Sequence, residues 1–271
     1  MGRPSLFDNR SKSIAMTADE NWNIIFSLND QRNTWFLERL RTDVGPRMTS
    51  RQTKRILDLG CGCGDGTFFL AALFPEAQVV GLDISEANIT HAQRESQVRQ
   101  MHRVSFACGD YAQVRFPGQH FDLIVADSVL HFIPDEAHEV WPKIVRDLAP
   151  GGHLVFSIPD DSLFNRLLWL VRFSLRQFRS SMTDRLILGV AKIVHGKGAS
   201  DEFLRERINY MYITPSVWFS KSFRNELCRK LGLVNVREQR YPHSSPGQFL
   251  HRLCIFSKPV TATSAATIRV A

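Results

Sequence analysis

Short apolar runs alternate with stretches of helical spacing between residues 54 and 158 of the chain. Each run has five or six residues and is bounded by glycine, proline or polar residues, which predicts a buried strand. The predicted strands are residues 55–59, 78–82, 104–108, 121–126 and 153–158. The predicted helices between them are residues 66–74, 86–100 and 135–148. Strands that alternate with helices are typical of an α/β fold with a parallel sheet.

The flanking segments differ from this core. Residues 1–20 are polar and predict a loose arm, whereas apolar positions in residues 21–41 recur at helical spacing. Residues 160–214 contain two apolar and basic helical stretches. Pro215 is expected to open a further helix, and the chain then ends with a predicted strand hairpin within residues 233–256.

This pattern divides the chain into five parts around one sheet. They are an N-terminal arm with cap helices at 1–53, the sheet core at 54–159, a helical insert at 160–214, a final helix and strand hairpin at 215–258, and a disordered tail at 259–271. The insert leaves the core after the fifth strand, where ligands of open α/β sheets bind.

The composition narrows the class of protein. Of the 271 residues, 44% are hydrophobic and 23% are charged, which argues against a disordered or collagen-like chain. The five cysteines lack the paired spacing of a zinc site or a disulfide framework, so we expect free thiols and no metal. Because no apolar run approaches the ~20 residues of a membrane span and no signal-peptide pattern is present, we expect a soluble, cytoplasmic protein.

The glycines of residues 60–66 carry the most specific chemical signal. A predicted strand containing Asp58 runs into Gly-Cys-Gly-Cys-Gly-Asp-Gly and then into a predicted helix. Glycine permits a tight turn and lets a ligand approach the backbone closely. A dinucleotide-binding fingerprint needs Gly-x-Gly-x-x-Gly, which these glycines do not supply in any register, so the motif argues against a dinucleotide site.

An acidic residue followed by Gly-x-Gly-x-Gly resembles the first motif of the class I S-adenosylmethionine (SAM)-dependent methyltransferases. The resemblance covers about residues 54–158, with Asp83, Asp110 and a Leu-x-Pro-Gly-Gly turn at 148–152 in the family's order. It implies a doubly wound, mostly parallel seven-stranded sheet whose last strand is antiparallel. It also implies SAM as the cofactor and S-adenosylhomocysteine (SAH) as the product.

The resemblance places the cofactor contacts at the ends of the first four strands. The position of Asp83 binds the ribose hydroxyls in the family, and that of Asp110 binds the adenine amino group, which suits carboxylates because they accept hydrogen bonds. Asp58 is expected to orient the glycine loop and to meet the aminoacyl end of SAM. The expected cofactor contacts are Asp58, Gly60, Cys61, Gly62, Gly64, Asp83, Ile84, Asp110, Tyr111, Asp127 and Ser128.

The loop after the fourth strand bears on the methyl acceptor. Relatives that methylate base amino groups or glutamine amides often carry Asn/Asp-Pro-Pro-aromatic there, whereas residues 126–129 read Ala-Asp-Ser-Val. Ser128 and His131 instead resemble the Ser-x-x-His of members that act on small molecules. His131 is therefore the candidate catalytic base, since a histidine of ordinary pKa, about 6.5, accepts a proton near neutral pH. The alternative is that His131 packs beneath the methionine part of SAM.

The net charge of +7 is concentrated in one segment. Residues 161–230 contain 13 Lys and Arg against 6 Asp and Glu, and the rest of the chain contains 21 of each. Three interpretations of the insert stay open: a structural cap, a lid over a lipophilic and anionic substrate, and contact of residues 162–195 with a membrane surface. Aliphatic residues interrupt the basic residues too often for a continuous positive surface that binds a nucleic-acid backbone. The candidate substrate contacts are Trp22, Trp169, Phe173, Tyr210, Tyr212 and Trp218.

The resemblance implies an enzyme that transfers a methyl group from SAM, and the apolar insert favours a small, lipophilic acceptor with no nucleic-acid partner. A methyltransferase acting on RNA or protein is one alternative. The other is a SAM-binding scaffold that transfers no methyl group.

Overall fold

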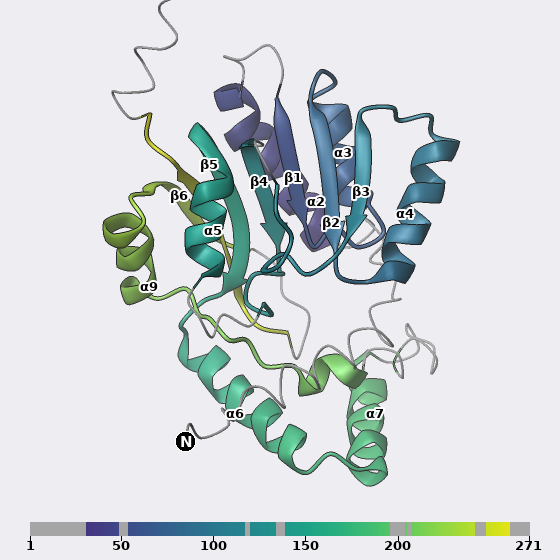
Figure 1. Ribbon diagram of the computed structural model, residues 1–271. Coiled ribbons are helices and arrows are strands. Elements are labelled where there is room, and N and C mark those ends of the chain that lie inside the picture. The colour runs from purple at the N-terminus through teal and green to yellow at the C-terminus, as the bar shows by residue number, and fades with distance from the viewer. Residues whose placement is uncertain are drawn as a thin grey trace, which may run out of the picture.

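The protein is built around one sheet with helices on both faces. The computed structural model describes residues 31–48, 54–116, 120–133, 139–195, 204, 208–241 and 248–260. The strands lie in the order β3-β2-β1-β4-β5-β7-β6 across the sheet (Figure 1). They are β1 (Arg55–Leu59), β2 (Gln78–Asp83), β3 (Val104–Cys108), β4 (Phe121–Asp127), β5 (Leu148–Pro159), β6 (Val234–Arg240) and β7 (His251–Ser257). Among these strands β7 alone runs in the opposite direction to the others, which confirms the expected sheet.

An aromatic cluster fixes the helices on one face of the sheet. These helices are α5 (Val140–Asp147), α9 (Lys221–Asn225) and the π-helical turn η5 (Glu226–Lys230). Trp141 of α5 packs edge-on against Phe156 of β5 and Phe223 of α9, with ring centroids 5.4 and 4.9 Å apart. Edge-to-face rings at this spacing are favourable beyond the area that they bury. The cluster therefore joins the C-terminal part of the chain to the centre of the sheet.

A second cluster covers the other face. The elements here are α2 (Gln31–Arg39), η1 (Leu40–Val44), η2 (Gly45–Met48) and α3 (Asp65–Leu73). Leu40 and Leu70 are almost fully buried against Ile56 of β1 and Val125 of β4. The helix α4 (Glu86–Val98) packs on β2 and β3. Ser85 caps it, because its hydroxyl accepts a hydrogen bond from the amide of Asn88.

The insert forms two helices beyond the carboxyl ends of the parallel strands (Figure 1). They are α6 (Leu163–Gln177) and α7 (Ser181–His195), followed by the short 3-10 helix η4 (Ile208–Tyr212). Asn165 of α6 is fully buried, and its side-chain amide donates to the carbonyls of Asp160 and Leu250, both at 2.8 Å. The Leu250 amide donates back to Asn165 Oδ1 at 2.8 Å. This one side chain therefore ties α6 to both β5 and the segment before β7.

Several expected element boundaries are wrong, among them those of the helix expected at 135–148, which spans Val140–Asp147 in the described residues. Pro215 does not open the next helix, because that helix begins at Lys221 with Ser220 as its cap, whose hydroxyl accepts from the amide of Phe223. The strand expected at 153–158 begins earlier, at Leu148. A register shift of β4 against β5 lets the Leu-Ala-Pro-Gly-Gly sequence join the strand.

Some expectations fall outside the part of the chain that the structure describes. They are the arm at 1–20, the first part of the expected N-terminal helices, and all but the first two residues of the tail at 259–271. In the described residues, no helix combines the length and the apolar character that crossing a membrane requires.

Candidate functional site

The glycine loop after β1 leaves its backbone open. Gly60, Gly62 and Gly64 have φ values of 71°, 54° and 93°, a region that favours glycine. A Cβ at Gly60 would lie 2.2 Å from Val129, so the loop after β4 packs directly on this glycine. A Cβ at Gly62 would meet nothing within 4 Å. The loop is therefore closed on the side of β4 and accessible to a ligand at Gly62, as a cofactor requires.

Asp83 holds this loop at the end of β2. Its side chain is buried, and its two carboxylate oxygens accept from the amides of Gly62 at 2.8 Å and Ser85 at 2.9 Å. Each carboxylate oxygen can accept about two hydrogen bonds, so the carboxylate retains capacity for two ribose hydroxyls. The neighbouring Ile84 side chain is 48% exposed, an unusual position for a large apolar residue and one that a bound adenosine would cover.

Asp110 follows the end of β3, the strand next to β2 in the sheet. The amide of Gly109 donates to the Asp83 carbonyl at 2.9 Å, so the ends of β2 and β3 meet. The Asp110 carboxylate accepts from the amide of Ala112 and is half-buried. Tyr111 points elsewhere, because it is buried in the core and its hydroxyl donates to Asp147 at 2.9 Å. Only the backbone of Tyr111 therefore remains beside the expected adenine position.

Asp58 is buried beneath the start of α3. The Thr67 hydroxyl donates to its carboxylate at 2.6 Å. Burial is the main cause that raises the pKa of Asp58 to about 7, and the nearby carboxylates of Asp127 and Asp83 act in the same direction. Its location supports the expected role of orienting the loop, and a cationic group of a ligand nearby would favour its charged form.

The two cysteines of the loop are buried thiols. Cys61 contacts the Gly62 carbonyl, and Cys63 contacts the Asn88 side-chain oxygen at 3.5 Å. Burial raises the pKa of both thiols above the ordinary value, so they stay protonated near neutral pH. Among the residues that the structure describes, no group of three or more His, Cys, Asp or Glu is placed to hold a metal ion.

A hydroxyl network surrounds Asp127 at the end of β4. One carboxylate oxygen accepts from Ser157 of β5, from Tyr241 after β6 at 2.8 Å and from Ser128 at 3.1 Å. The Ser128 hydroxyl also lies 3.4 Å from Nδ1 of His251, at the start of β7. Ser128 has a φ of 60°, which the bond from its amide to Ser157 Oγ helps to hold. Four strand ends therefore contribute to one polar cluster.

His131 lies beside this network and is 1% exposed. Its ring packs against Phe132 and meets the ring of His251 edge-on, with centroids 5.1 Å apart. Its carbonyl accepts from both the amide and the hydroxyl of Ser216, which fixes the loop after β4. The candidate base is thus paired with a second histidine that sequence reasoning did not find.

Ser157, Tyr241 and His251 are the cluster members that sequence reasoning missed. Tyr241 and His251 lie more than 100 residues after Asp127 and reach it only because β7 inserts between β5 and β6. No local motif marks them. The register that pairs Pro159 with His251 brings them to the carboxyl edge of the sheet.

The candidate substrate contacts fall into separate groups. Trp169 and Phe173 stack on each other along α6, with centroids 5.0 Å apart. Tyr212 is buried near α7, and its hydroxyl donates to Asp184 at 2.5 Å. Trp218 packs edge-on against Phe249. Trp22 and the Tyr210 side chain lie outside the described residues.

Arg172 joins α6 to the Trp218–Phe249 group. Its guanidinium lies 4.4 Å from the centre of the Phe249 ring and donates to the Ile213 carbonyl at 3.2 Å. The side chain is 6% exposed, and burial lowers its pKa to about 10, so it remains a cation at neutral pH. Phe249 is two residues before His251 in the sequence, so this cation packs on the segment that leads into β7.

Comparison with known proteins agrees with this geometry. Residues 56–152 match the family model described as a methyltransferase domain. Trans-aconitate 2-methyltransferase of Methylobacterium nodulans is 36% identical over 126 residues, which is 46% of each chain. The enzyme of that name from Methylobacterium radiotolerans is 42% identical over 105 residues, 39% of this chain and 38% of the relative. The chain thus matches less than half the length of these curated relatives.

Solved structures share the fold over nearly the whole chain. The N-methyltransferase NodS of Bradyrhizobium japonicum in complex with SAH is similar with a TM-score of 0.53, 18% identity and coverage of 91% of this chain and 98% of NodS. The 1,6-didemethyltoxoflavin-N1-methyltransferase of Burkholderia thailandensis has a TM-score of 0.59 at 15% identity and covers 96% and 93%. The chain therefore has the fold of the class I methyltransferases, and its residues 56–152 are similar to a methyltransferase domain.

Proposed function

We propose that this protein transfers the methyl group of SAM to a small molecule that joins an anionic group to an apolar part. SAM as the methyl donor is supported by one observation: Gly62, Asp83 and Asp110 meet at one edge of the sheet. When bound, SAM supplies an activated methyl group on a sulfonium. The open backbone at Gly62, the spare acceptor capacity of Asp83 and the exposed Ile84 side chain support binding of its adenosine part.

The substrate class rests on Arg172 and its aromatic neighbours. The guanidinium would meet the anionic group, while Trp218 and Phe249 would pack against the apolar part. The curated relatives are named for trans-aconitate, a small acid, which supports a substrate that carries an anionic group. Positioning can dominate the rate of methyl transfer, because alignment of reacting groups in a dry pocket contributes ~7–11 kcal/mol.

His131 is proposed to take the proton that an O–H, N–H or C–H acceptor loses, whereas a carboxylate acceptor has no proton to lose and would need His131 only for positioning. His251 would act as a positioning residue, since its ring contacts His131 and its Nδ1 lies near the Ser128 hydroxyl. Asp127 would in turn hold the orientation of Ser128 through the bond at 3.1 Å. The alternative role, packing of His131 beneath the methionine part of SAM, predicts a loss of cofactor affinity instead of a loss of turnover.

The test measures SAH formation by the full chain with SAM and a panel of acids of graded apolar content, trans-aconitate among them. We expect turnover with acids, and we expect Arg172→Gln to raise KM for them while SAM affinity is unchanged. Arg166→Gln is the matched control, because Arg166 is exposed and pairs with Asp161. SAM binding without SAH formation across the panel would favour the scaffold, and methylation of RNA or protein alone would favour the other enzyme class.

A further inference from the structure

The helix α6 buries two of its polar side chains and exposes several large apolar ones. Asn165 and Arg172 are 0% and 6% exposed and face the body of the protein, whereas Arg166 is exposed. The outer face of the helix presents Leu163 at 73% and Leu167 and Leu170 at 54% each. A surface helix ordinarily turns its apolar stripe towards the core. The outer face of α6 is therefore suited to an apolar environment.

The helix α7 continues this apolar surface. Ile187 packs inward against Tyr212 and Ile208 of η4, so the inner face of α7 is already covered by apolar contacts. Its outer positions fall at a helical spacing of three or four residues. They are Met182, Leu186, Val190 and Ile193, which are between 53% and 84% exposed.

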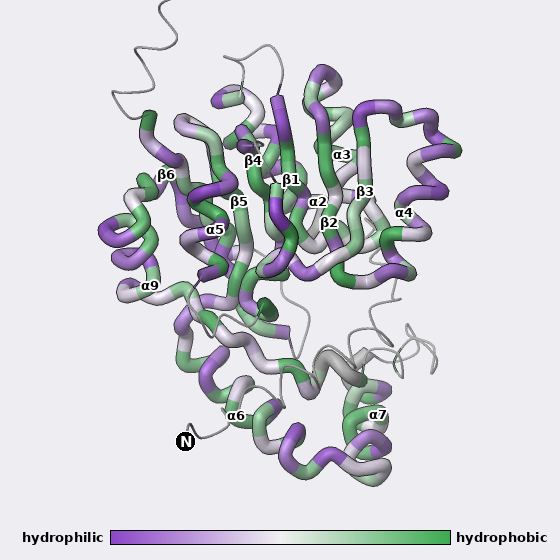
Figure 2. Tube along the Cα trace, viewed as in Figure 1, coloured by the Kyte–Doolittle hydropathy of each residue, from purple (hydrophilic) through white to green (hydrophobic). Residues whose placement is uncertain are grey.

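Most of the exposed apolar surface is on these two helices. Ten of the fourteen large apolar residues that are exposed in the described part of the chain belong to α6, to α7 or to the turn between them. An apolar groove lined by Leu170, Val171, Leu175 and Phe178 runs between the helices. Figure 2 shows apolar residues recurring along both helices, at the end of the molecule beyond the sheet. Exposed apolar side chains gathered on two neighbouring helices are typical of a binding face.

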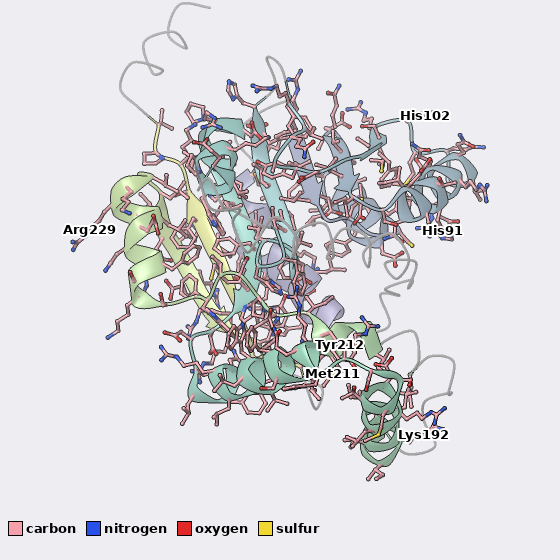
Figure 3. The ribbon with its side chains drawn as sticks, turned by 60° about the horizontal axis from the view of Figure 1, so that its bottom comes forward. His91, His102, Lys192, Met211, Tyr212 and Arg229 are labelled. Atoms are coloured by element: carbon pink, nitrogen blue, oxygen red, sulfur yellow. The ribbon has the colours of Figure 1, made fainter. Side chains whose placement is uncertain are left out.

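The charge around this face is mainly positive. Residues 163–195 contain six Lys and Arg and one Asp, and the carboxylate of that Asp184 accepts from the Tyr212 hydroxyl. Arg179, Arg185 and Lys192 are exposed. Figure 3 shows Lys192 on α7, with Met211 and Tyr212 between this helix and the sheet. Basic residues that flank an apolar helix face are typical of helices that lie in the interface of an anionic membrane.

We propose that the outer face of α6 and α7 docks on a bilayer surface that contains anionic phospholipid. The apolar stripes would enter the boundary between headgroups and acyl chains, and the basic residues would meet the lipid phosphates. A second copy of the chain fits this face less well, because two faces with the same excess of positive charge repel each other. The proposal does not depend on the proposed substrate, since it concerns the face of the helices turned away from the sheet.

Vesicle flotation of the full chain tests this inference. We expect binding to vesicles of phosphatidylglycerol and phosphatidylcholine and much weaker binding to phosphatidylcholine alone. Leu167→Glu with Leu186→Glu should reduce the partition coefficient by about tenfold or more. Arg185→Gln and Lys192→Gln should each reduce binding to anionic vesicles about fivefold. The matched controls are Val98→Glu on α4 and Val234→Glu on β6, which are 77% and 51% exposed outside the insert.

SAM affinity measured on every variant establishes that each is folded. The proposal is overturned if the wild type does not bind anionic vesicles, or if the control variants lose binding as strongly as the insert variants. Sedimentation of the same samples tests whether a second copy of the chain, instead of a bilayer, covers this face. A wild-type dimer that Leu186→Glu dissociates, without vesicle binding, would make this face an interface between copies and would overturn the lipid assignment.

Discussion

Asp58 carries a pH dependence that follows from its burial. Its pKa of about 7 in the folded protein exceeds the ordinary value of 3.8. The folded state therefore binds a proton between about pH 4 and 7 that the unfolded chain has released, so the free energy of unfolding falls as pH rises through this window. We expect the free energy of unfolding to change less with pH in Asp58→Asn, which keeps the acceptor for Thr67. Urea unfolding of the wild type and the variant at pH 5 and pH 8 measures this change. An equal change in the two proteins would contradict the assignment.

Asp83 is predicted to be the main determinant of cofactor affinity. Asp83→Ala removes the acceptor for the amides of Gly62 and Ser85 as well as the proposed ribose contacts. Loss of one charged hydrogen bond costs about 1.5–3 kcal/mol, which corresponds to a loss of SAM affinity of roughly 10- to 150-fold. Titration calorimetry measures the change. Asp122→Ala is the control, because Asp122 accepts from the Arg55 amide at the opposite edge of the sheet and its removal should leave the affinity unaltered.

His131 is predicted to affect turnover more than binding. If it removes the acceptor proton, His131→Ala should lower kcat by about 10²–10⁴ and leave the SAM dissociation constant nearly unchanged. Steady-state kinetics with the substrate identified from the acid panel measures both quantities. His153→Ala on β5 provides a comparison histidine, half-buried near Arg47 and Lys54 and away from this cluster. Weak SAM binding with normal turnover at saturation would identify the packing role.

At the scale of elements, the helix α6 is predicted to act as part of a lid over the substrate. Residues 160–214 would close over the carboxyl edge when ligands bind, which excludes water from the methyl donor. Asn165→Ala leaves the Leu250 backbone without its side-chain partners and should loosen α6. We expect hydrogen exchange in α6 to slow when SAH and substrate bind and to accelerate in Asn165→Ala, while the strands stay protected. Strong protection of α6 without ligand, unaltered by ligand, would instead indicate a fixed cap.

Local sequence predicted the elements well where side-chain pattern and turn residues agreed. The strands at 55–59 and 104–108 match β1 and β3 to the residue, because each apolar run ends directly before a glycine. The start of α9 was not predictable from Pro215, since Ser220 supplies the hydroxyl that caps the helix. The segment contains several serines, and which of them caps the helix depends on the path of the chain in the folded protein. The local sequence does not state that path.

The same distinction applies to the site. Asp83 and Asp110 were expected together because the carboxyl ends of neighbouring parallel strands meet at one edge. His251 and Tyr241 depend instead on the antiparallel insertion of β7 between β5 and β6. Such long-range pairing leaves no fixed spacing in the sequence. The outward apolar face of α6 was also not predictable, because helical periodicity defines a face without stating which way it turns.

At the scale of the whole molecule, the cofactor edge and the basic insert occupy one end of the sheet. SAH bound at this edge would contact the loops after β1, β2, β3 and β4, which hold both faces of the core together. Binding to the folded state alone at about 100 times the dissociation constant stabilises a protein by about 2.7 kcal/mol. For a domain of this size each kcal/mol raises Tm by about 2–4 °C, so we expect a shift of roughly 5–11 °C.

A thermal unfolding experiment can separate this site from a dinucleotide site. SAM and SAH should raise Tm, and NAD should not, because the glycines at 60, 62, 64 and 66 lack the dinucleotide spacing and Asp83 already holds the loop through Gly62. Asp83→Ala should lose most of the shift, whereas Leu186→Glu on the outer face of α7 should retain it. Stabilisation by NAD equal to that by SAH would contradict the cofactor geometry. A shift lost in Leu186→Glu would mean that the outer face of the insert is coupled to the cofactor edge.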